Sequence, residues 1–220
     1  MHLKVYNAII YTKLIITSLV FSYDGFDREV FVTKNVKLEV KNFAADFEIP
    51  WGMAFLPDTS MLVTDLSGSL YRVYQDGDKD VIKGMQNVYY KGQGGLLDVE
   101  VHPDFSENNY IYVSYSQPKK GKAFTAVARA KLIRNQLEDF EIIYSTEYKH
   151  YSRKTVHFGS RFAISGDYLF FSIGDRGERD EAQDLDKPNG KIHRLHLDGR
   201  IPRDNPYKSK NGDVSTIWCY

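Results

Sequence analysis

The chain has 220 residues, a length that allows one large domain or two small ones. Its 29 Lys and Arg residues balance its 29 Asp and Glu residues, so no overall charge attracts it to nucleic acid or to an anionic membrane surface. Aromatic residues make up 14% of the chain, with 16 Tyr and 13 Phe, and such residues favour the pleated surfaces of β-strands.

The first 23 residues differ from the rest of the chain. Scattered basic residues precede an apolar run from Leu14 to Phe21, and the small residue Ser22 follows that run. The run is shorter than the roughly 20 residues of a membrane span, and the pattern is typical of a secretory signal peptide cleaved near Ser22. We therefore expect residues 1–23 to be a signal peptide or N-terminal leader of a periplasmic or secreted protein, without a stable membrane span.

Two alternatives for the leader stay open, because Lys13 lies close to the apolar run. The segment could be a retained signal anchor, or the start codon could be misassigned so that the first residues carry no meaning.

After a polar connector, the chain carries three short apolar segments that predict a β-meander. The expected strands are Met53–Leu56, Met61–Thr64 and Leu70–Val73. Turns are expected at Pro57-Asp58 and at Ser67-Gly68, because Pro, Gly and Asp supply the backbone angles that tight turns need.

The same plan occurs twice more. Each copy has an apolar strand, a turn that contains Asp, a strand rich in Tyr, Phe or Leu, and a third strand. The second copy consists of Gly95–Val101, the turn His102-Pro103-Asp104, Tyr110–Tyr115 and Ala126–Ile133, and the third consists of Ser160–Ile164, the turn Gly166-Asp167, Tyr168–Ile173 and Lys191–Leu195.

The recurrence of the turn predicts an all-β chain made of propeller blades. The turn aspartate recurs at intervals of roughly 45 to 65 residues, near the length of a propeller repeat. A β-sandwich is the runner-up, because it also has short strands and regular turns. Closed propellers use typically 4 to 8 blades, so three blades predict an N-terminal fragment in which Thr216–Tyr220 is a strand interrupted within a blade. On this interpretation residues 24–220 are the N-terminal part of the propeller. Cys219 is the only cysteine, so no disulfide can form within the chain.

A glycine-rich loop, Lys91-Gly92-Gln93-Gly94-Gly95, directly precedes a predicted strand. No Gly-Lys-Ser/Thr follows it and no helix begins there, so neither a phosphate-binding loop nor a dinucleotide fingerprint is present. Taken by itself, the loop is equally consistent with a tight turn between blades in which Gln93 faces solvent.

A second segment with chemical potential begins at His157, where the inner strand of a blade would start near the propeller axis. A neutral imidazole there could accept a proton, although a lone histidine at a strand end is more often structural. We interpret His102 in its turn as structural, and His193 and His196 lack the partners of a zinc site. The acidic loop of residues 175–186 departs from the EF-hand pattern and contains several basic residues, which favours a solvated or salt-bridged loop. No metal site is predicted.

Taken together, four motifs resemble the glucose/sorbosone dehydrogenase family, in particular its soluble aldose sugar dehydrogenases. They are Gly92-Gln93-Gly94-Gly95-Leu96-Leu97-Asp98, His102-Pro103-Asp104-Phe105, His157-Phe158-Gly159-Ser160-Arg161 and Ile173-Gly174-Asp175-Arg176-Gly177. The resemblance covers the chain from about Ile49 to its end. It implies a six-bladed propeller that uses pyrroloquinoline quinone and calcium to oxidise the anomeric carbon of aldose sugars to a lactone.

The resemblance also implies roles for individual residues. His157 matches the general base that takes the proton of the anomeric hydroxyl while hydride passes to the quinone. Gln93 matches a glutamine that contacts both cofactor and sugar, and Asp175 matches an aspartate near the sugar. Such a division of labour is chemically reasonable, because the cofactor supplies the redox chemistry and the protein orients it and handles one proton.

Two features separate this chain from the family pattern. Val156 stands where the glucose dehydrogenase branch has an acidic residue, which favours the broader aldose branch. The family's His-Arg-Asn-Pro segment, whose arginine polarises the quinone, and its calcium ligands are expected downstream of Tyr220, so the chain by itself is expected to be inactive. The implied partners are an aldose sugar and an electron acceptor that the sequence does not identify. The alternative function is a non-catalytic propeller that binds a ligand or a protein on its axial face.

Overall fold

The computed structural model describes residues 28–220, and the predicted leader lies outside this range. The chain divides into two compact units, and the second begins at Asp46. The first unit contains an antiparallel hairpin of β1 (Arg28–Val32) and β2 (Lys37–Lys41), closed by a turn in which the Thr33 hydroxyl donates to the Val36 carbonyl. The sequence pattern predicts a polar connector here, so this hairpin was not predicted.

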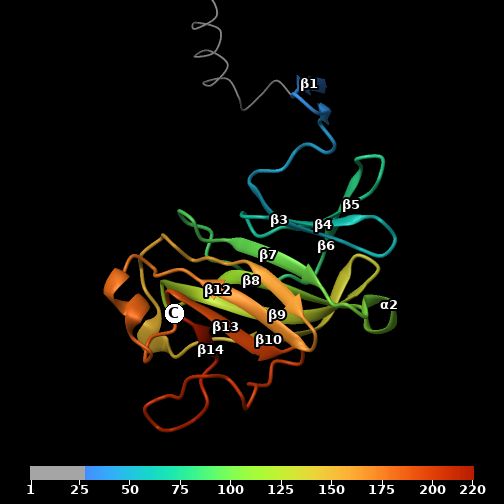
Figure 1. The fold of residues 1–220 in the computed structure, drawn as a ribbon. Coiled ribbons are helices and arrows are strands. Elements are labelled where there is room, and N and C mark those ends of the chain that lie inside the picture. Colours follow the sequence, from blue (N-terminus) through green and yellow to red (C-terminus); the bar gives the residue numbers. More distant parts are fainter. Residues whose placement is uncertain (1–27) are drawn as a thin grey trace, which may run out of the picture. The chain divides into compact units, whose positions relative to one another are not determined.

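The second unit contains three four-stranded antiparallel sheets in chain order (Figure 1). The first sheet consists of β3 (Pro50–Phe55), β4 (Met61–Asp65), β5 (Leu70–Val73) and β6 (Lys79–Ile82); the second of β7 (Leu96–Val101), β8 (Tyr110–Lys119), β9 (Lys122–Ile133) and β10 (Gln136–Tyr144); the third of β11 (Phe162–Ser165), β12 (Tyr168–Ile173), β13 (Lys191–His196) and β14 (Ile217–Cys219). Short helices are α2 (Phe105–Asn108), η1 (Tyr148–His150) and η2 (Arg179–Gln183).

The three predicted blades are therefore confirmed, each as a meander in which sequential strands pair. Two outer strands, β6 and β10, are absent from the prediction because they carry many charged residues and few buried ones. Within the last predicted segment, Ile217–Cys219 forms β14, which pairs with β13 as the fourth strand of the third sheet.

The apolar core lies between successive sheets. Leu62 and Leu70 of the first sheet pack with Leu96 and Ile111 of the second. On the other side of the second sheet, a separate cluster joins it to Phe171 and its neighbours in the third. Because side chains alternate along a strand, β8 can serve both cores, and six of its residues in succession are buried.

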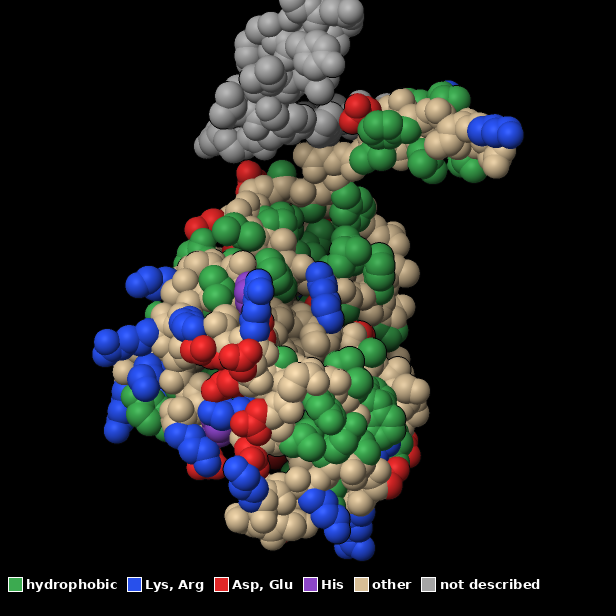
Figure 2. All heavy atoms as spheres, turned by 60° about the vertical axis from the view of Figure 1, so that its left-hand side comes forward, with side chains coloured by type: hydrophobic (Ala, Val, Ile, Leu, Met, Phe, Trp, Pro, Cys, Tyr) green, Lys and Arg blue, Asp and Glu red, His purple; other side chains and the backbone are tan. Residues whose placement is uncertain are grey.

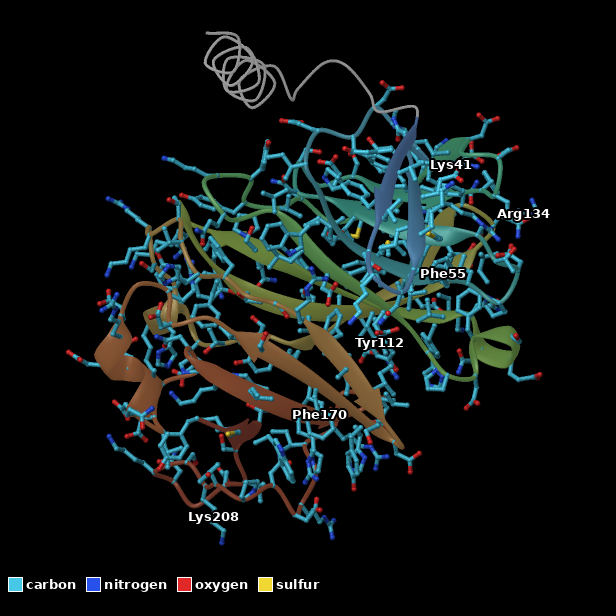
Figure 3. The ribbon with its side chains drawn as sticks, turned by 45° about the horizontal axis from the view of Figure 1, so that its top comes forward. Lys41, Phe55, Tyr112, Arg134, Phe170 and Lys208 are labelled. Carbon is cyan, nitrogen blue, oxygen red and sulfur yellow. The ribbon has the colours of Figure 1, made fainter. Side chains whose placement is uncertain are left out.

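Tyr112 shows how β8 reaches the third sheet. Its side chain is fully buried, and its hydroxyl donates to the Leu197 carbonyl at 2.9 Å (Figure 3). Its strand neighbours Ile111 and Val113 face the opposite core, toward the first sheet. Strand β8 is therefore buried on both faces, and its first half consequently reads as an almost continuous run of apolar and aromatic residues.

Inner strands β3, β7 and β11 lie side by side, and β-bulges redirect residues from two of them. The pairing of β7 with β8 shifts between Leu96 and Val99, and that of β3 with β4 shifts between Pro50 and Gly52. A bulge inserts one extra residue and changes the direction of the neighbouring side chains. These irregularities occur at Asp98 and at Trp51.

Asp98 links the second and third sheets through its buried carboxylate. Oδ1 accepts a hydrogen bond from Arg161 Nη1 at 3.0 Å, and Oδ2 accepts one from the Phe162 amide at 2.8 Å. A Cβ at Gly52 in the first sheet would lie 2.5 Å from Oδ1, so that position accommodates only glycine. Burial raises the pKa of Asp98, while the hydrogen bonds from Phe162 and Arg161 oppose this rise.

His193 of β13 is completely buried in the third sheet. Its Nε2 lies 2.8 Å from the Pro188 carbonyl, which can only accept, so Nε2 carries the proton. Nδ1 then accepts from the Thr216 hydroxyl at 2.9 Å. The ring stacks on Phe171 at an interplanar angle of 12°. Burial of this neutral imidazole lowers its pKa to about 4.

Because the Asp98 carboxylate bonds the second sheet to the third, its removal should reduce the stability of the fold strongly. Asp98→Ala leaves the Phe162 amide and the Arg161 guanidinium without their acceptor and should lower the free energy of unfolding by about 2–4 kcal/mol. Glu141→Ala is the matched control, because Glu141 is half exposed and pairs with Arg129 on the surface; it should cost less than about 1 kcal/mol. Urea denaturation of the full-length gene product measures both, and equal losses would contradict the assignment.

His193 predicts how stability changes with pH. Because the folded-state pKa is about 4 and the unfolded value is 6.5, protonation favours the unfolded chain. The contribution of His193 is complete above pH 6.5 and is lost as the pH falls toward 4, by about 2 kcal/mol between pH 7 and pH 5. His193→Gln should remove this part of the pH dependence, whereas His196→Gln on the same strand should retain it. Denaturation midpoints from pH 7 to pH 5 test the difference.

Candidate functional site

The glycine-rich loop and the segment before β11 meet in the structure, and this brings Gln93 and His157 together. The backbone N–H of Gln93 donates to the Thr155 carbonyl at 2.8 Å. The side-chain Oε1 of Gln93 accepts a hydrogen bond from the backbone N–H of His157 at 2.7 Å. Gln93 therefore fixes the backbone of His157, a contact for which the sequence pattern gives no signal.

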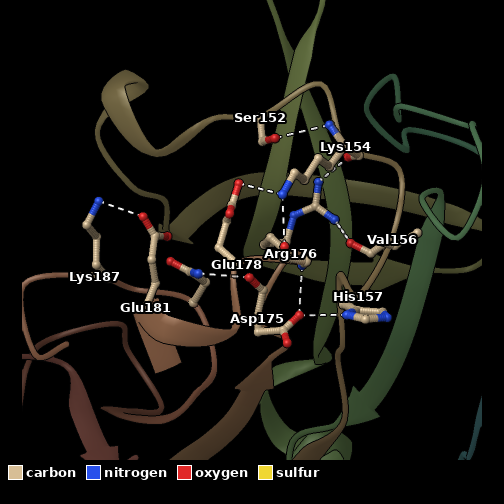
Figure 4. Close-up of polar contacts among 11 residues, drawn as sticks. Ser152, Lys154, Val156, His157, Asp175, Arg176, Glu178, Glu181 and Lys187 are labelled. Carbon is tan, nitrogen blue, oxygen red and sulfur yellow. Dashed lines mark hydrogen bonds and ion pairs between the residues drawn. The ribbon is translucent and has the colours of Figure 1, made fainter. Parts of the chain in front are cut away.

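Asp175 lies at the imidazole of His157 (Figure 4). Nδ1 of His157 and Oδ1 of Asp175 are 2.6 Å apart, and the Gly177 amide also donates to this Oδ1 at 2.8 Å. The hydrogen bond from His157, followed by that from Gly177, lowers the pKa of Asp175. An ionised Asp175 can only accept, so Nδ1 of a neutral His157 carries the proton and Nε2 keeps its lone pair. The His157 side chain is 51% exposed.

Backbone geometry adds to the placement of His157. Its φ is +52°, in the left-handed region that bulky residues rarely adopt. Gly174, which directly follows β12, lies against it: a Cβ at position 174 would be 2.3 Å from the His157 carbonyl oxygen. Glycine at 174 is thus required for the close approach of the two segments.

His157 and Gln93 line a cavity of about 310 Å³ at the starts of the inner strands. Arg161 also lines it, with a side chain that is 67% exposed although Nη1 and Nη2 donate to Asp98 and to the Trp51 carbonyl. The remaining lining residues are Trp51, Phe158, Gly159, Ser160 and Ser172. Asp175 contacts His157 but is not among the residues that line the cavity.

Trp51, Arg161 and Ser160 are site residues that sequence reasoning missed. Ser160 is buried, and its hydroxyl has no hydrogen-bond partner in the structure. Arg161 could have been found from the sequence, because it belongs to the motif that begins at His157. Trp51 could not, because the direction of its side chain depends on the irregular pairing of β3 with β4. A larger hollow of about 870 Å³ lies beside the third sheet, but none of the predicted site residues lines it.

The acidic loop is paired with basic side chains. Glu178 contacts Lys154 at 2.6 Å, Glu181 contacts Lys187 at 2.7 Å, and Asp186 contacts Lys210. Figure 2 shows acidic and basic side chains side by side on one face of the molecule. Within residues 28–220, no three His, Cys, Asp or Glu side chains are grouped as a metal site would require.

Comparison with known proteins places this geometry in a family. The family model described as Glucose / Sorbosone dehydrogenase matches residues 47–220. Aldose sugar dehydrogenase YliI of Escherichia coli (strain K12) is 39% identical over 177 residues, which are 78% of this chain and 47% of that protein. Quinoprotein glucose dehydrogenase B of Acinetobacter calcoaceticus is 28% identical over 215 residues, 84% of this chain and 44% of that protein.

A solved structure shows the same fold. The soluble aldose sugar dehydrogenase from Escherichia coli in its apo form superposes with a TM-score of 0.74 at 37% identity, over 80% of this chain and 52% of that one. The chain spans about half the length of the curated relatives that it matches.

The hydrogen bond to Asp175 should determine which ring nitrogen of His157 carries the proton. Asp175→Asn replaces the ionised acceptor by an amide and should increase the population of His157 with the proton on Nε2. Nitrogen-15 NMR of the histidine-labelled full-length gene product distinguishes the two tautomers. Asp180→Asn, an exposed carboxylate in the same loop, should leave the spectrum unchanged. A wild-type protein that already carries the proton on Nε2 would contradict the geometry.

Proposed function

Because the chain belongs to the glucose/sorbosone dehydrogenase family, we propose that its full-length gene product oxidises the anomeric carbon of aldose sugars to lactones. The observation that supports this proposal most directly is the hydrogen-bonded pair of His157 and Asp175, in which His157 lines a cavity. The identity of 39% to an aldose sugar dehydrogenase supports this substrate class. Val156, which precedes His157 in place of an acidic residue, supports the broader aldose branch over a glucose-specific enzyme.

His157 is the proposed general base. With Nδ1 bonded to Asp175, Nε2 has a free lone pair, and the imidazole is half exposed at the cavity. Nε2 would take the proton of the anomeric hydroxyl, and the ionised carboxylate of Asp175 would stabilise the imidazolium that forms. Proton transfer by a positioned base contributes typically 10²–10⁴-fold to a rate.

Pyrroloquinoline quinone is the proposed cofactor, and a quinoprotein among the relatives supports it. When bound, the quinone would accept the hydride from the anomeric carbon. The residues present fit one side of such a group: Arg161 exposes part of a guanidinium to the cavity, Gln93 brings an amide, and Trp51 brings an aromatic ring. The cavity of about 310 Å³ lies at the lower end of the roughly 300–1,000 Å³ of ligand sites.

Gln93 and His157 are the proposed direct contacts to the sugar. The direct contact of Asp175 that the resemblance implies stays a prediction, because Asp175 does not line the cavity. Calcium is part of the proposal, and none of the described residues is assigned to it as a ligand. Export to the periplasm or medium is likewise proposed, from the pattern of residues 1–23. Among residues 28–220 there is no helix with the length and apolar character that a membrane span requires.

The full-length gene product, reconstituted with pyrroloquinoline quinone and calcium, should reduce an artificial dye when an aldose is added. His157→Ala should lower kcat by roughly 10²–10⁴-fold. His102→Gln is the matched control, because His102 bonds to the Asp104 amide in a turn of the second sheet, and it should retain activity. Absence of sugar-dependent dye reduction would exclude the proposed activity and favour a propeller that only binds. Full activity in His157→Ala would instead exclude His157 as the general base.

A further inference from the structure

Arg176 follows Asp175 in the chain and is almost completely buried, with 2% of the residue exposed. Its guanidinium donates two hydrogen bonds to backbone carbonyls: Nη1 to Val156 and Nη2 to Lys154, the latter at 2.6 Å (Figure 4). The guanidinium carbon also lies 3.3 Å from the ring centroid of Phe158. Each of these three contacts is made with the segment that carries His157.

Burial of this cation is costly, so its presence needs an explanation. Desolvation lowers the pKa of Arg176 to about 10, and Asp175 opposes this shift. Its Nε is buried and has no hydrogen-bond partner among residues 28–220. No carboxylate accepts from the guanidinium in the described structure; the two bonds go to neutral carbonyls. The gain is therefore geometric, because a planar fork of donors fixes two acceptors relative to each other.

The carbonyls of residues 154–156 are each held by a hydrogen bond. The Arg176 guanidinium donates to the carbonyls of Lys154 and Val156, and the backbone N–H of Gln93 donates to the carbonyl of Thr155 between them. The next residue is His157, whose amide is bonded to Gln93 and whose imidazole is bonded to Asp175. The turn after β12 thus fixes the backbone before His157 through Arg176 and the His157 ring through Asp175.

We propose that Arg176 is a positioning residue for His157: its two hydrogen bonds to the Lys154 and Val156 carbonyls fix where the imidazole lies at the cavity. The inference rests on the proposed function for its kinetic consequence, but the placement of the His157 ring can be measured without activity. Misplacement of a reacting group by about 1 Å can cost on the order of 10²-fold in rate.

Two variants distinguish the two hydrogen bonds of the Arg176 guanidinium from its positive charge. Arg176→Met keeps an unbranched apolar side chain and removes the whole guanidinium with both donors, whereas Arg176→Lys keeps the charge but cannot bridge both carbonyls. Arg194→Met is the matched control, because Arg194 is also buried in the third sheet and stacks on Tyr168, and its hydrogen bonds go to Asp204 and Asn205. The control should destabilise the fold without moving His157.

The readouts are the nitrogen-15 NMR signals of the His157 ring and, in the reconstituted enzyme, kcat and KM for the aldose. In Arg176→Met we expect shifted or doubled His157 signals and a kcat lowered by roughly 10–100-fold, with KM changed less than about twofold. Arg176→Lys should lie between this variant and the wild type, and it provides the test if Arg176→Met fails to fold. Arg194→Met should lower Tm and keep the wild-type His157 signals.

The outcomes distinguish the two proposals. Shifted His157 signals in a protein that oxidises no sugar would support the positioning role and exclude the proposed function. His157 signals identical to the wild type in both Arg176 variants, with only Tm reduced as in Arg194→Met, would overturn the inference. Wild-type signals and kcat in Arg176→Lys would also overturn it, since charge alone would then suffice.

Discussion

The buried carboxylate of Asp98 is the constraint on which the arrangement of the site depends. It belongs to β7, accepts hydrogen bonds from the Arg161 side chain and the Phe162 amide of the third sheet, and packs against Gly52 of the first. Burial of the charge is unfavourable, so the hydrogen bonds across the sheets offset a cost that the fold would otherwise not bear. Apolar contacts between the sheets are less directional, and the carboxylate specifies where β11 begins relative to β7.

The site follows from this placement. Once the start of β11 is fixed through Arg161 and Phe162, the preceding residues 157–160 pass the cavity, and loops of the second and third sheets meet them there. Gln93 comes from the loop before β7, and Asp175 and Arg176 come from the turn after β12. The residues of the proposed site thus lie on loops that the sheets position, an arrangement that is common for binding and catalytic residues. The left-handed backbone at His157 and at Arg176 is maintained by these surrounding contacts.

Much of the fold could be predicted from the sequence because the inner and middle strands of each blade are apolar and end at clear turns. The outer strand β6, Lys79–Ile82, could not, since only one of its four residues is buried and its pattern resembles a loop. The position of His157 and the importance of Gln93 were predicted through family resemblance. The short distance between His157 and Asp175, and the carbonyls held by Arg176, depend on a turn and a segment about 20 residues apart. Local patterns carry no signal for such contacts.

A crystal structure of the full-length gene product with pyrroloquinoline quinone, calcium and an aldose would show whether His157 is placed to act on the sugar. We expect the anomeric hydroxyl oxygen to lie about 2.6–3.2 Å from Nε2 of His157, with Nδ1 still bonded to Asp175. A sugar bound away from the cavity of His157 and Gln93, or an imidazole turned so that Nε2 faces Asp175, would contradict it.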